Sequence, residues 1–206
     1  MRQSDYGHMR VIGITGGVGS GKSALLAYVA EKYNCRVLLA DEIAHKVKEP
    51  GQPCYEKLVA LLSSQILKED GSIHKGKLAA RIFTSRELLK AVNDRVHPAV
   101  KQMILDEIGR AREEGKLDFF FIEAALLIEN GYLDIVDDMW YIYSTKEIRC
   151  RRLRESRNYS DEKIEAIMKS QLAEEQFRKY CNVVIDNNEN MQTAFEQIDR
   201  RLGEYL

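Results

Sequence analysis

The chain has 206 residues, of which 45% are hydrophobic and 31% are charged. This is enough for a sizeable hydrophobic core, either in one large domain or in a central domain that carries an insertion. Lysine and arginine number 31 and aspartate and glutamate 32, so the formal net charge of −1 gives no general attraction to nucleic acid or to a membrane surface. The four cysteines form no C-x-x-C pair, which argues against a zinc site and a disulfide framework. We expect a monomer or small homo-oligomer, with neither nucleic acid nor a membrane as a partner.

The N-terminal residues give no targeting signal. The first ten residues contain no apolar signal segment, and no stretch approaches the ~18 apolar residues that a membrane helix needs. This predicts a cytoplasmic protein. Residues 1–8 precede the first predicted strand and have no evident structural role, so we interpret them as a tag or a disordered extension. Residues 9–206 are expected to form one domain.

Short β-rich runs alternate with longer helical patterns along the chain, which is typical of a parallel sheet covered by helices. The fold class is therefore α/β. Thr84-x-x-Glu87 and Ser144-x-x-Glu147 match the capping box, and Ser160 precedes two acidic residues, so a helix is expected to begin at each of these places. The five strands are predicted at residues 11–15, 37–40, 119–122, 139–143 and 183–185.

The stretch between the second and third strands is too long and too interrupted for one helix. Pro50-Gly51-Gln52-Pro53 breaks it, Asp70-Gly71 predicts a turn, and His97-Pro98 predicts a further helix boundary. We therefore predict a helical, substrate-binding insertion over about residues 42–117. The core of the domain would then comprise residues 9–41 and 118–206.

Residues 16–23 spell G-x-x-x-x-G-K-S between the first predicted strand and a helical pattern, which is the context of a phosphate-binding loop, or P-loop. Glycines let such a loop turn its N–H groups inward, and the following helix presents its positive end to the phosphates. Lys22 is expected to reach the β- and γ-phosphates of ATP, and the Ser23 hydroxyl to bind Mg²⁺. The fold is thus a P-loop nucleoside triphosphate hydrolase type. The predicted ATP-binding residues are Gly17, Val18, Gly19, Ser20, Gly21, Lys22, Ser23 and Ala24.

Acidic residues follow two of the predicted strands, at the edge where open α/β sheets bind ligands. Asp41 is expected to orient an acceptor hydroxyl and to accept its proton, and the alternative is an N-cap of the next helix. Glu123 is expected to hold Mg²⁺ through water, and the alternative is a solvated acid at a strand end. Both alternatives remain open at this point.

Five arginines lie within nine positions, at residues 149, 151, 152, 154 and 157. On a helix they would spread over more than one face, so they cannot all contact one ligand. We predict a mobile lid over about residues 146–170 that brings Arg152 or Arg157 onto the transferring phosphate. A purely solvated helix face is the alternative.

These motifs together resemble the dephospho-CoA kinase family. The resemblance rests on the P-loop, Ala40 to His45, Glu49-Pro50-Gly51, Asp70 to Ile73, His97-Pro98, Glu123 to Glu129, Arg152-Leu153, Gln171 and Val184 to Asn187, in family order from Met9 onward. It implies ATP-dependent phosphorylation of the 3′-hydroxyl of dephospho-CoA, the last step of coenzyme A biosynthesis.

The resemblance also carries roles onto particular residues. It makes Asp41 the base, and it implies substrate contacts from His97, Glu129 and Lys75. The chain departs from the family where Glu123 and Ala125 replace an aspartate and a proline. It departs again at Lys75, where arginine is common, because an ammonium cannot fork onto a phosphate as a guanidinium does.

Two other functions share part of this pattern. Another small-molecule or nucleoside monophosphate kinase would have the same sheet, P-loop and lid, with a different acceptor pocket. A P-loop GTPase would act by binding partners, but the chain lacks the N-K-x-D string that such proteins use to read guanine.

Overall fold

The computed structural model describes residues 9–124, 127–128 and 131–206, so the interpretation of residues 1–8 and the role of Glu129 fall outside the described residues. The chain divides into two compact units. The sheet unit comprises Met1–Leu38 and Ala111–Leu206, and the insertion unit comprises Leu39–Arg110. Each unit is described by itself.

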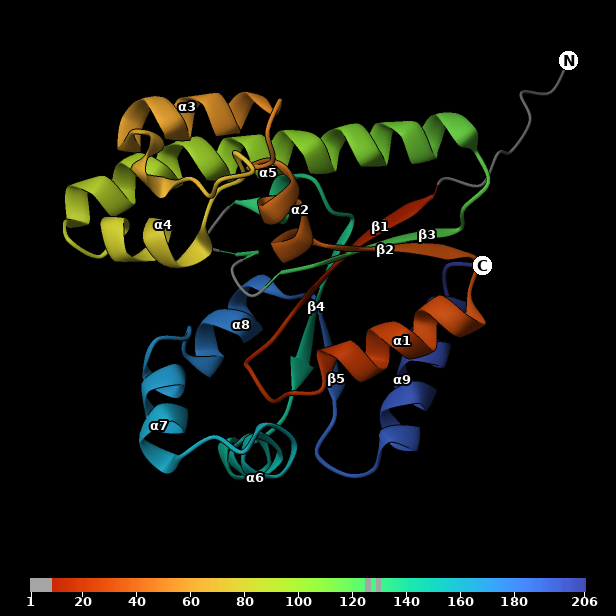
Figure 1. Ribbon diagram of the computed structural model, residues 1–206. Helices are drawn as coiled ribbons and strands as arrows, with labels where there is room; N and C mark the ends of the chain where they lie inside the picture. Colours follow the sequence, from red (N-terminus) through yellow and green to blue (C-terminus); the bar gives the residue numbers. More distant parts are fainter. Residues whose placement is uncertain (1–8, 125–126, 129–130) are drawn as a thin grey trace, which may run out of the picture. The chain divides into compact units, whose positions relative to one another are not determined.

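The sheet unit contains the parallel five-stranded sheet that the sequence predicts (Figure 1). Its strands follow the order β2-β3-β1-β4-β5. The three interior strands, β3, β1 and β4, are almost wholly buried, which is why they read as nearly continuous apolar runs such as Phe119 to Ile122. The strands are β1 (Arg10–Thr15), β2 (Cys35–Leu39), β3 (Phe119–Glu123), β4 (Asp138–Tyr143) and β5 (Val183–Asp186).

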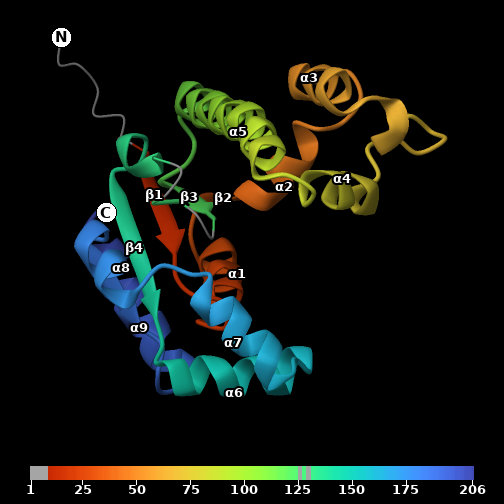
Figure 2. The ribbon, with the colours of Figure 1, turned by 90° about the vertical axis from the view of Figure 1, so that its left-hand side faces the viewer.

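Helices cover both faces of this sheet. Helices α1 (Lys22–Lys32) and α9 (Met191–Gly203) contact each other and cover the face that carries Phe121 and Trp140. On the other face, α8 (Glu174–Tyr180) places Phe177 parallel to the ring of Tyr141, with ring centroids 4.8 Å apart. The remaining elements of this unit are η2 (Tyr132–Asp134), α6 (Lys146–Arg157) and α7 (Asp161–Lys169), of which α6 and α7 follow β4 (Figure 2).

A cluster of hydrogen bonds ties the first helix to the last. The Asp199 carboxylate of α9 accepts hydrogen bonds from the hydroxyls of Tyr28 and Tyr33 and from Lys32 Nζ. The Tyr28 ring also stacks on Phe195, with centroids 3.8 Å apart. The C-terminal half of the helix that carries the P-loop lysine is thereby joined to α9.

Five segments make up the insertion unit, and α5 extends beyond it to Glu114. They are α2 (Ala40–Lys46), α3 (Pro53–Leu62), η1 (Ser64–Ile66), α4 (Lys75–Ile82) and α5 (Arg86–Glu114). The predicted break is confirmed, since Pro53 stands at the start of α3 and Gly51 has a φ of 85°. The predicted turn is confirmed as well: Gly71 has a φ of 79° and Asp70 Oδ1 accepts from Ser72 N at 2.8 Å.

The helix boundary predicted at His97-Pro98 is wrong, because α5 runs through Pro98. A proline inside a helix removes one hydrogen bond and costs about 3 kcal/mol. The helix compensates with a buried stripe at every fourth position, formed by Val92, Val96, Val100, Ile104 and Ile108. Tertiary packing therefore outweighs the local break.

Of the three expected helix caps, one is confirmed and two are displaced by one residue. Ser160 caps α7 by accepting from Lys163 N. Ser85, not Thr84, accepts from the N–H of Leu88 at the start of α5. Thr145, not Ser144, caps α6, because the Ser144 hydroxyl is buried and donates to the Asn187 carbonyl oxygen at 2.8 Å.

The four cysteines are free, in agreement with the expected absence of a disulfide framework. Across the described ranges, no helix has both the length and the apolar character needed to cross a membrane.

Candidate active site

The P-loop follows β1 and leads directly into α1, as the sequence predicts. Gly19 and Gly21 have φ values of 85° and 94°, which residues with a side chain rarely adopt, and Gly21 forms the N-cap of α1. The loop is closed internally by Ser20 N, which donates to the Gly17 carbonyl oxygen at 3.1 Å. Backbone N–H groups at the start of α1 therefore lie at the mouth of the loop, where an anion is stabilised.

Lys22 lies inside this loop. Its Nζ donates to the Gly16 carbonyl oxygen at 2.8 Å and lies 3.7 Å from Glu123 Oε1, and the two charged side chains are 12% and 18% exposed. Burial lowers the pKa of Lys22, with the negative charge of Glu123 opposing this and the positive charges of Arg149 and Arg157 adding to it. Lys22 and Arg149 thus bring two cations to the P-loop, which suits a polyanionic ligand.

The predicted magnesium residues have the right chemistry. Ser23 contributes a hydroxyl in the first turn of α1, and Glu123 contributes a carboxylate from the end of β3, beside β1. Mg²⁺ prefers oxygen ligands and is usually held by one or two protein groups together with substrate phosphates. In the described part of the chain no cluster of three histidine, cysteine or acidic side chains could hold a metal, and the magnesium-binding roles of Ser23 and Glu123 stay predictions.

The arginines of α6 have different surroundings. Arg152 donates to Ser144 Oγ at 3.0 Å and to the Asn187 carbonyl oxygen at 2.9 Å, so it joins the segments that follow β4 and β5. Arg154 is exposed and forms an ion pair with Asp161 at 2.7 Å. The reach of Arg152 or Arg157 to a phosphate stays a prediction.

Arg149 lies over the P-loop, although the sequence did not distinguish it within the cluster. Its Nε donates to the Val18 carbonyl oxygen at 2.9 Å, and its Nη2 donates to Gln171 Oε1. A Cβ atom on Gly17 would overlap the Arg149 guanidinium, so the absence of a side chain at this variable position of the motif makes room for it. The sequence assigned no role to Gln171 beyond its match to the family. No local pattern links it to Arg149, which lies 22 positions earlier.

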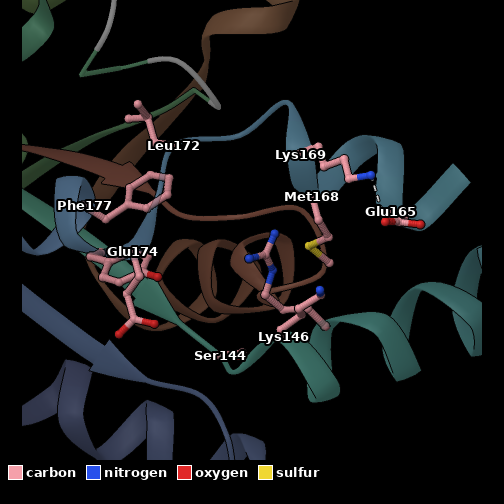
Figure 3. Close-up of a pocket in the computed structure, with 10 residues that line it drawn as sticks. Ser144, Lys146, Glu165, Met168, Lys169, Leu172, Glu174 and Phe177 are labelled. Carbon is pink, nitrogen blue, oxygen red and sulfur yellow. Dashed lines mark ion pairs between the residues drawn. The ribbon is translucent and has the colours of Figure 1, made fainter. Parts of the chain in front are cut away.

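Beside Arg149 a cavity of about 310 Å³ opens at the end of β4, between α6, α7 and α8. Figure 3 shows Lys146 and Phe177 on its wall, together with the ion pair between Lys169 and Glu165, whose Nζ and Oε1 atoms are 2.9 Å apart. This volume is at the lower end of ordinary small-molecule sites. It lies within the sheet unit.

The insertion unit carries three further predicted site residues. Asp41 is exposed in the first turn of α2, where Leu39 is the N-cap, so the alternative reading of Asp41 as an N-cap is wrong. His97 lies half-buried on α5, and Lys75 begins α4. The proposed roles of these three side chains stay predictions.

Asp41 and Lys75 belong to a charged group that the sequence did not reveal. Burial lowers the pKa of His45, and the charges of Lys48 and Lys75 lower it further while Asp41 opposes them. Burial likewise lowers the pKa of Lys48, which also senses Lys75 and Asp41. The unit thus has two lysines, a histidine and a carboxylate in one neighbourhood. Such a group suits a phosphorylated acceptor with a nearby hydroxyl.

The site is typical of P-loop kinases, which are phosphotransferases. It consists of a strand, a glycine loop and a helix around a lysine, with an arginine over the loop. A family model described as dephospho-CoA kinase matches residues 10–193, and the chain therefore belongs to the dephospho-CoA kinase family.

Individual relatives agree with this assignment. The chain is 34% identical over 194 residues to the dephospho-CoA kinase of Corynebacterium diphtheriae, covering 94% of this chain and 96% of that protein. It is 32% identical over 188 residues to the dephospho-CoA kinase of Carboxydothermus hydrogenoformans, covering 91% and 90%. The crystal structure of TT1252 from Thermus thermophilus is similar with a TM-score of 0.78 and 29% identity, covering 96% of this chain and 98% of that one.

Proposed function

We propose that this protein transfers the γ-phosphoryl group of ATP to the 3′-hydroxyl of dephospho-CoA, which yields coenzyme A and ADP. Membership of the family supports the acceptor. The observation that carries the reaction type is Lys22, buried in a P-loop and facing the Glu123 carboxylate. The cytoplasm, where both small-molecule substrates occur, would be the site of action, and neither nucleic acid nor a membrane takes part.

The mechanism follows from the groups at the loop. The N–H groups of the P-loop and Lys22 would bind the β- and γ-phosphates and offset the charge that develops on them. Asp41 would accept the proton of the 3′-hydroxyl while the oxygen of this hydroxyl attacks the γ-phosphorus. The bond between the γ-phosphorus and the β–γ bridging oxygen would break, and ADP would leave. Mg²⁺, held by Ser23 and through water by Glu123, would neutralise phosphate charge.

A switch GTPase is the alternative of a different class. A D-x-x-G string, which such proteins use to sense the γ-phosphate, is present as Asp106 to Gly109. It lies inside α5, whereas a γ-phosphate sensor follows a strand, so this string gives no support to a GTPase. The N-K-x-D string is missing from the sequence.

The proposal is tested by ADP release in the presence of ATP and a panel of acceptors, with the product identified by mass spectrometry. We expect release to depend on dephospho-CoA, the product to gain one phosphate, and a chelator of divalent cations to abolish the reaction. Nucleoside monophosphates serve as competing acceptors. Faster transfer to a nucleoside monophosphate than to dephospho-CoA would contradict the proposed substrate, and transfer from GTP with no acceptor would favour the GTPase.

A further inference from the structure

One carboxamide oxygen connects the segment after α7 to the P-loop. Gln171 Oε1 accepts a hydrogen bond from the N–H of Val18 at 3.3 Å and a second from Arg149 Nη2. The same guanidinium donates from Nε to the carbonyl oxygen of Val18 at 2.9 Å. Two nitrogens of Arg149 are therefore fixed, and with them the plane of its guanidinium.

The position of this guanidinium is where a transferring phosphate would pass. It occupies the space beside the Gly17 α-carbon, and its positive charge helps to lower the pKa of Lys22. The lysine of a P-loop contacts the β- and γ-phosphates. Neither hydrogen-bond partner of Arg149 within the described residues, the Val18 carbonyl or the Gln171 amide, is charged. The guanidinium thus keeps its full positive charge for a ligand, although the side chain is half-buried.

We propose that Gln171 is a positioning residue for phosphoryl transfer, and that it holds the Arg149 guanidinium over the P-loop so that Arg149 contacts the transferring phosphate. This rests on the proposed kinase function. A neutral amide suits the task because it orients the guanidinium without neutralising it. A carboxylate at residue 171 would hold Arg149 more strongly, but it would also repel the phosphate.

The two ends of the segment from α6 to α7 both contact the P-loop. Arg149 lies near the start of α6, and Gln171 follows the end of α7 at Lys169. Both ends of the segment therefore meet on the backbone of a single residue, Val18, at its N–H and at its carbonyl oxygen. A nucleotide that enters the loop would find the arginine already in place.

The test compares Gln171→Ala, Gln171→Glu and Arg149→Ala with the unmodified protein, by steady-state kinetics with ATP and dephospho-CoA. For Gln171→Ala we expect kcat to fall about 10- to 100-fold while the KM for ATP changes less than about threefold. The reason is that a misplaced guanidinium stabilises the transition state less, while it affects the binding of ATP little. For Gln171→Glu we expect a similar fall in kcat together with a higher KM for ATP. Arg154→Ala removes an exposed arginine of the same helix and should leave both constants unchanged.

The double variant Gln171→Ala with Arg149→Ala tests the route of the effect. If Gln171 acts through Arg149, the double variant should be no slower than Arg149→Ala alone. Added guanidinium ion should restore part of the activity of Arg149→Ala, and it should restore less when Gln171 is also replaced. Circular dichroism and thermal unfolding of each variant show whether it is folded.

Three results would overturn the inference. They are wild-type kinetics for Gln171→Ala, independent and multiplicative effects of the two substitutions, and equal guanidinium rescue in both backgrounds. Failure of the unmodified protein to phosphorylate dephospho-CoA would instead refute the proposed function, so the two failures are distinguishable.

Discussion

Replacing Gly17 by alanine should slow phosphoryl transfer without destabilising the fold. Gly17 is not one of the glycines with a positive φ, so its backbone accepts a side chain without strain. The new methyl group would nevertheless overlap Arg149, with Nη1 only 2.5 Å away. Since non-bonded atoms prefer separations of about 3.5 Å and the Cζ and Nη2 atoms are nearer still, the guanidinium must move by more than about 1 Å.

The size of the effect follows from this displacement. A misplacement of about 1 Å at a reacting centre can cost about 100-fold in rate, so we expect kcat to fall about 10- to 100-fold, or about 1.4 to 2.7 kcal/mol in activation free energy. Stability should stay the same or rise by about 0.4–1 kcal/mol, because alanine restricts the unfolded chain more than glycine does.

The assay is ADP release coupled to a spectrophotometric readout, with chemical denaturation run in parallel. Gly109→Ala is the matched control, because it makes the same change in α5 at a position where a Cβ has no neighbour within 4 Å. Wild-type kcat for Gly17→Ala would refute the reasoning. So would an equal loss of rate when Gly17→Ala is introduced into Arg149→Ala, where no guanidinium remains to be displaced.

Three further predictions concern other residues. Lys22→Ala should lower kcat by at least about 10²- to 10³-fold with an unchanged unfolding curve, because Lys22 is expected to act on phosphate; near-wild-type turnover at saturating Mg-ATP would refute this. Asp41→Asn should lower kcat about 10²- to 10⁴-fold and leave the Kd for ATP within about threefold; a rise in KM alone would make Asp41 a binding residue. Asp138→Asn should cost about 2 kcal/mol of unfolding free energy at pH 7 and less at pH 3, measured by denaturation at both pH values.

The pH dependence of the last variant follows from the surroundings of Asp138. Burial alone would raise the pKa of this carboxyl, but hydrogen bonds from Arg10 Nε and Asn182 Nδ2, both at 2.5 Å, lower it below its ordinary value. The folded protein therefore binds this proton less readily than the unfolded chain does. The stabilisation is complete above the ordinary pKa of about 4 and is lost as the pH falls through the lower folded pKa. A constant difference from pH 7 to pH 3 would contradict this account.

The sequence could predict the sheet and the P-loop because both depend on local patterns. A strand such as Phe119–Glu123 is an apolar run whose length suits a strand, and the glycine spacing at residues 16–21 reports a backbone that only glycine tolerates. The helix through Pro98 could not be predicted, because a buried stripe formed by tertiary contacts overrides the local signal. The displaced caps have a similar cause, since neighbouring hydroxyls compete and Ser144 is used elsewhere.

The sequence also could not predict which arginine lies over the P-loop. Five arginines in nine positions are chemically equivalent until the rotation of the helix is known, and Arg149 is distinguished only by its hydrogen bonds to Val18 and Gln171. The spacing of 22 residues between Arg149 and Gln171 carries no periodic signal. Asp41, by contrast, is a candidate from the sequence because it directly follows the strand predicted at residues 37–40; in the structure this strand ends at Leu39, and the role of Asp41 stays a prediction.

The order of the strands has a consequence for how this protein is made. The strand that carries the P-loop is synthesised first, yet its partners are β3 and β4, with Arg10 opposite Phe119 and Ile12 opposite Asp138. Both edges of β1 therefore remain without their native partners until about 120 further residues have left the ribosome, on the order of 6 to 25 s at typical rates of synthesis. During this interval an apolar strand with open edges can pair with other chains. The nascent chain should therefore depend on chaperones until β4 emerges.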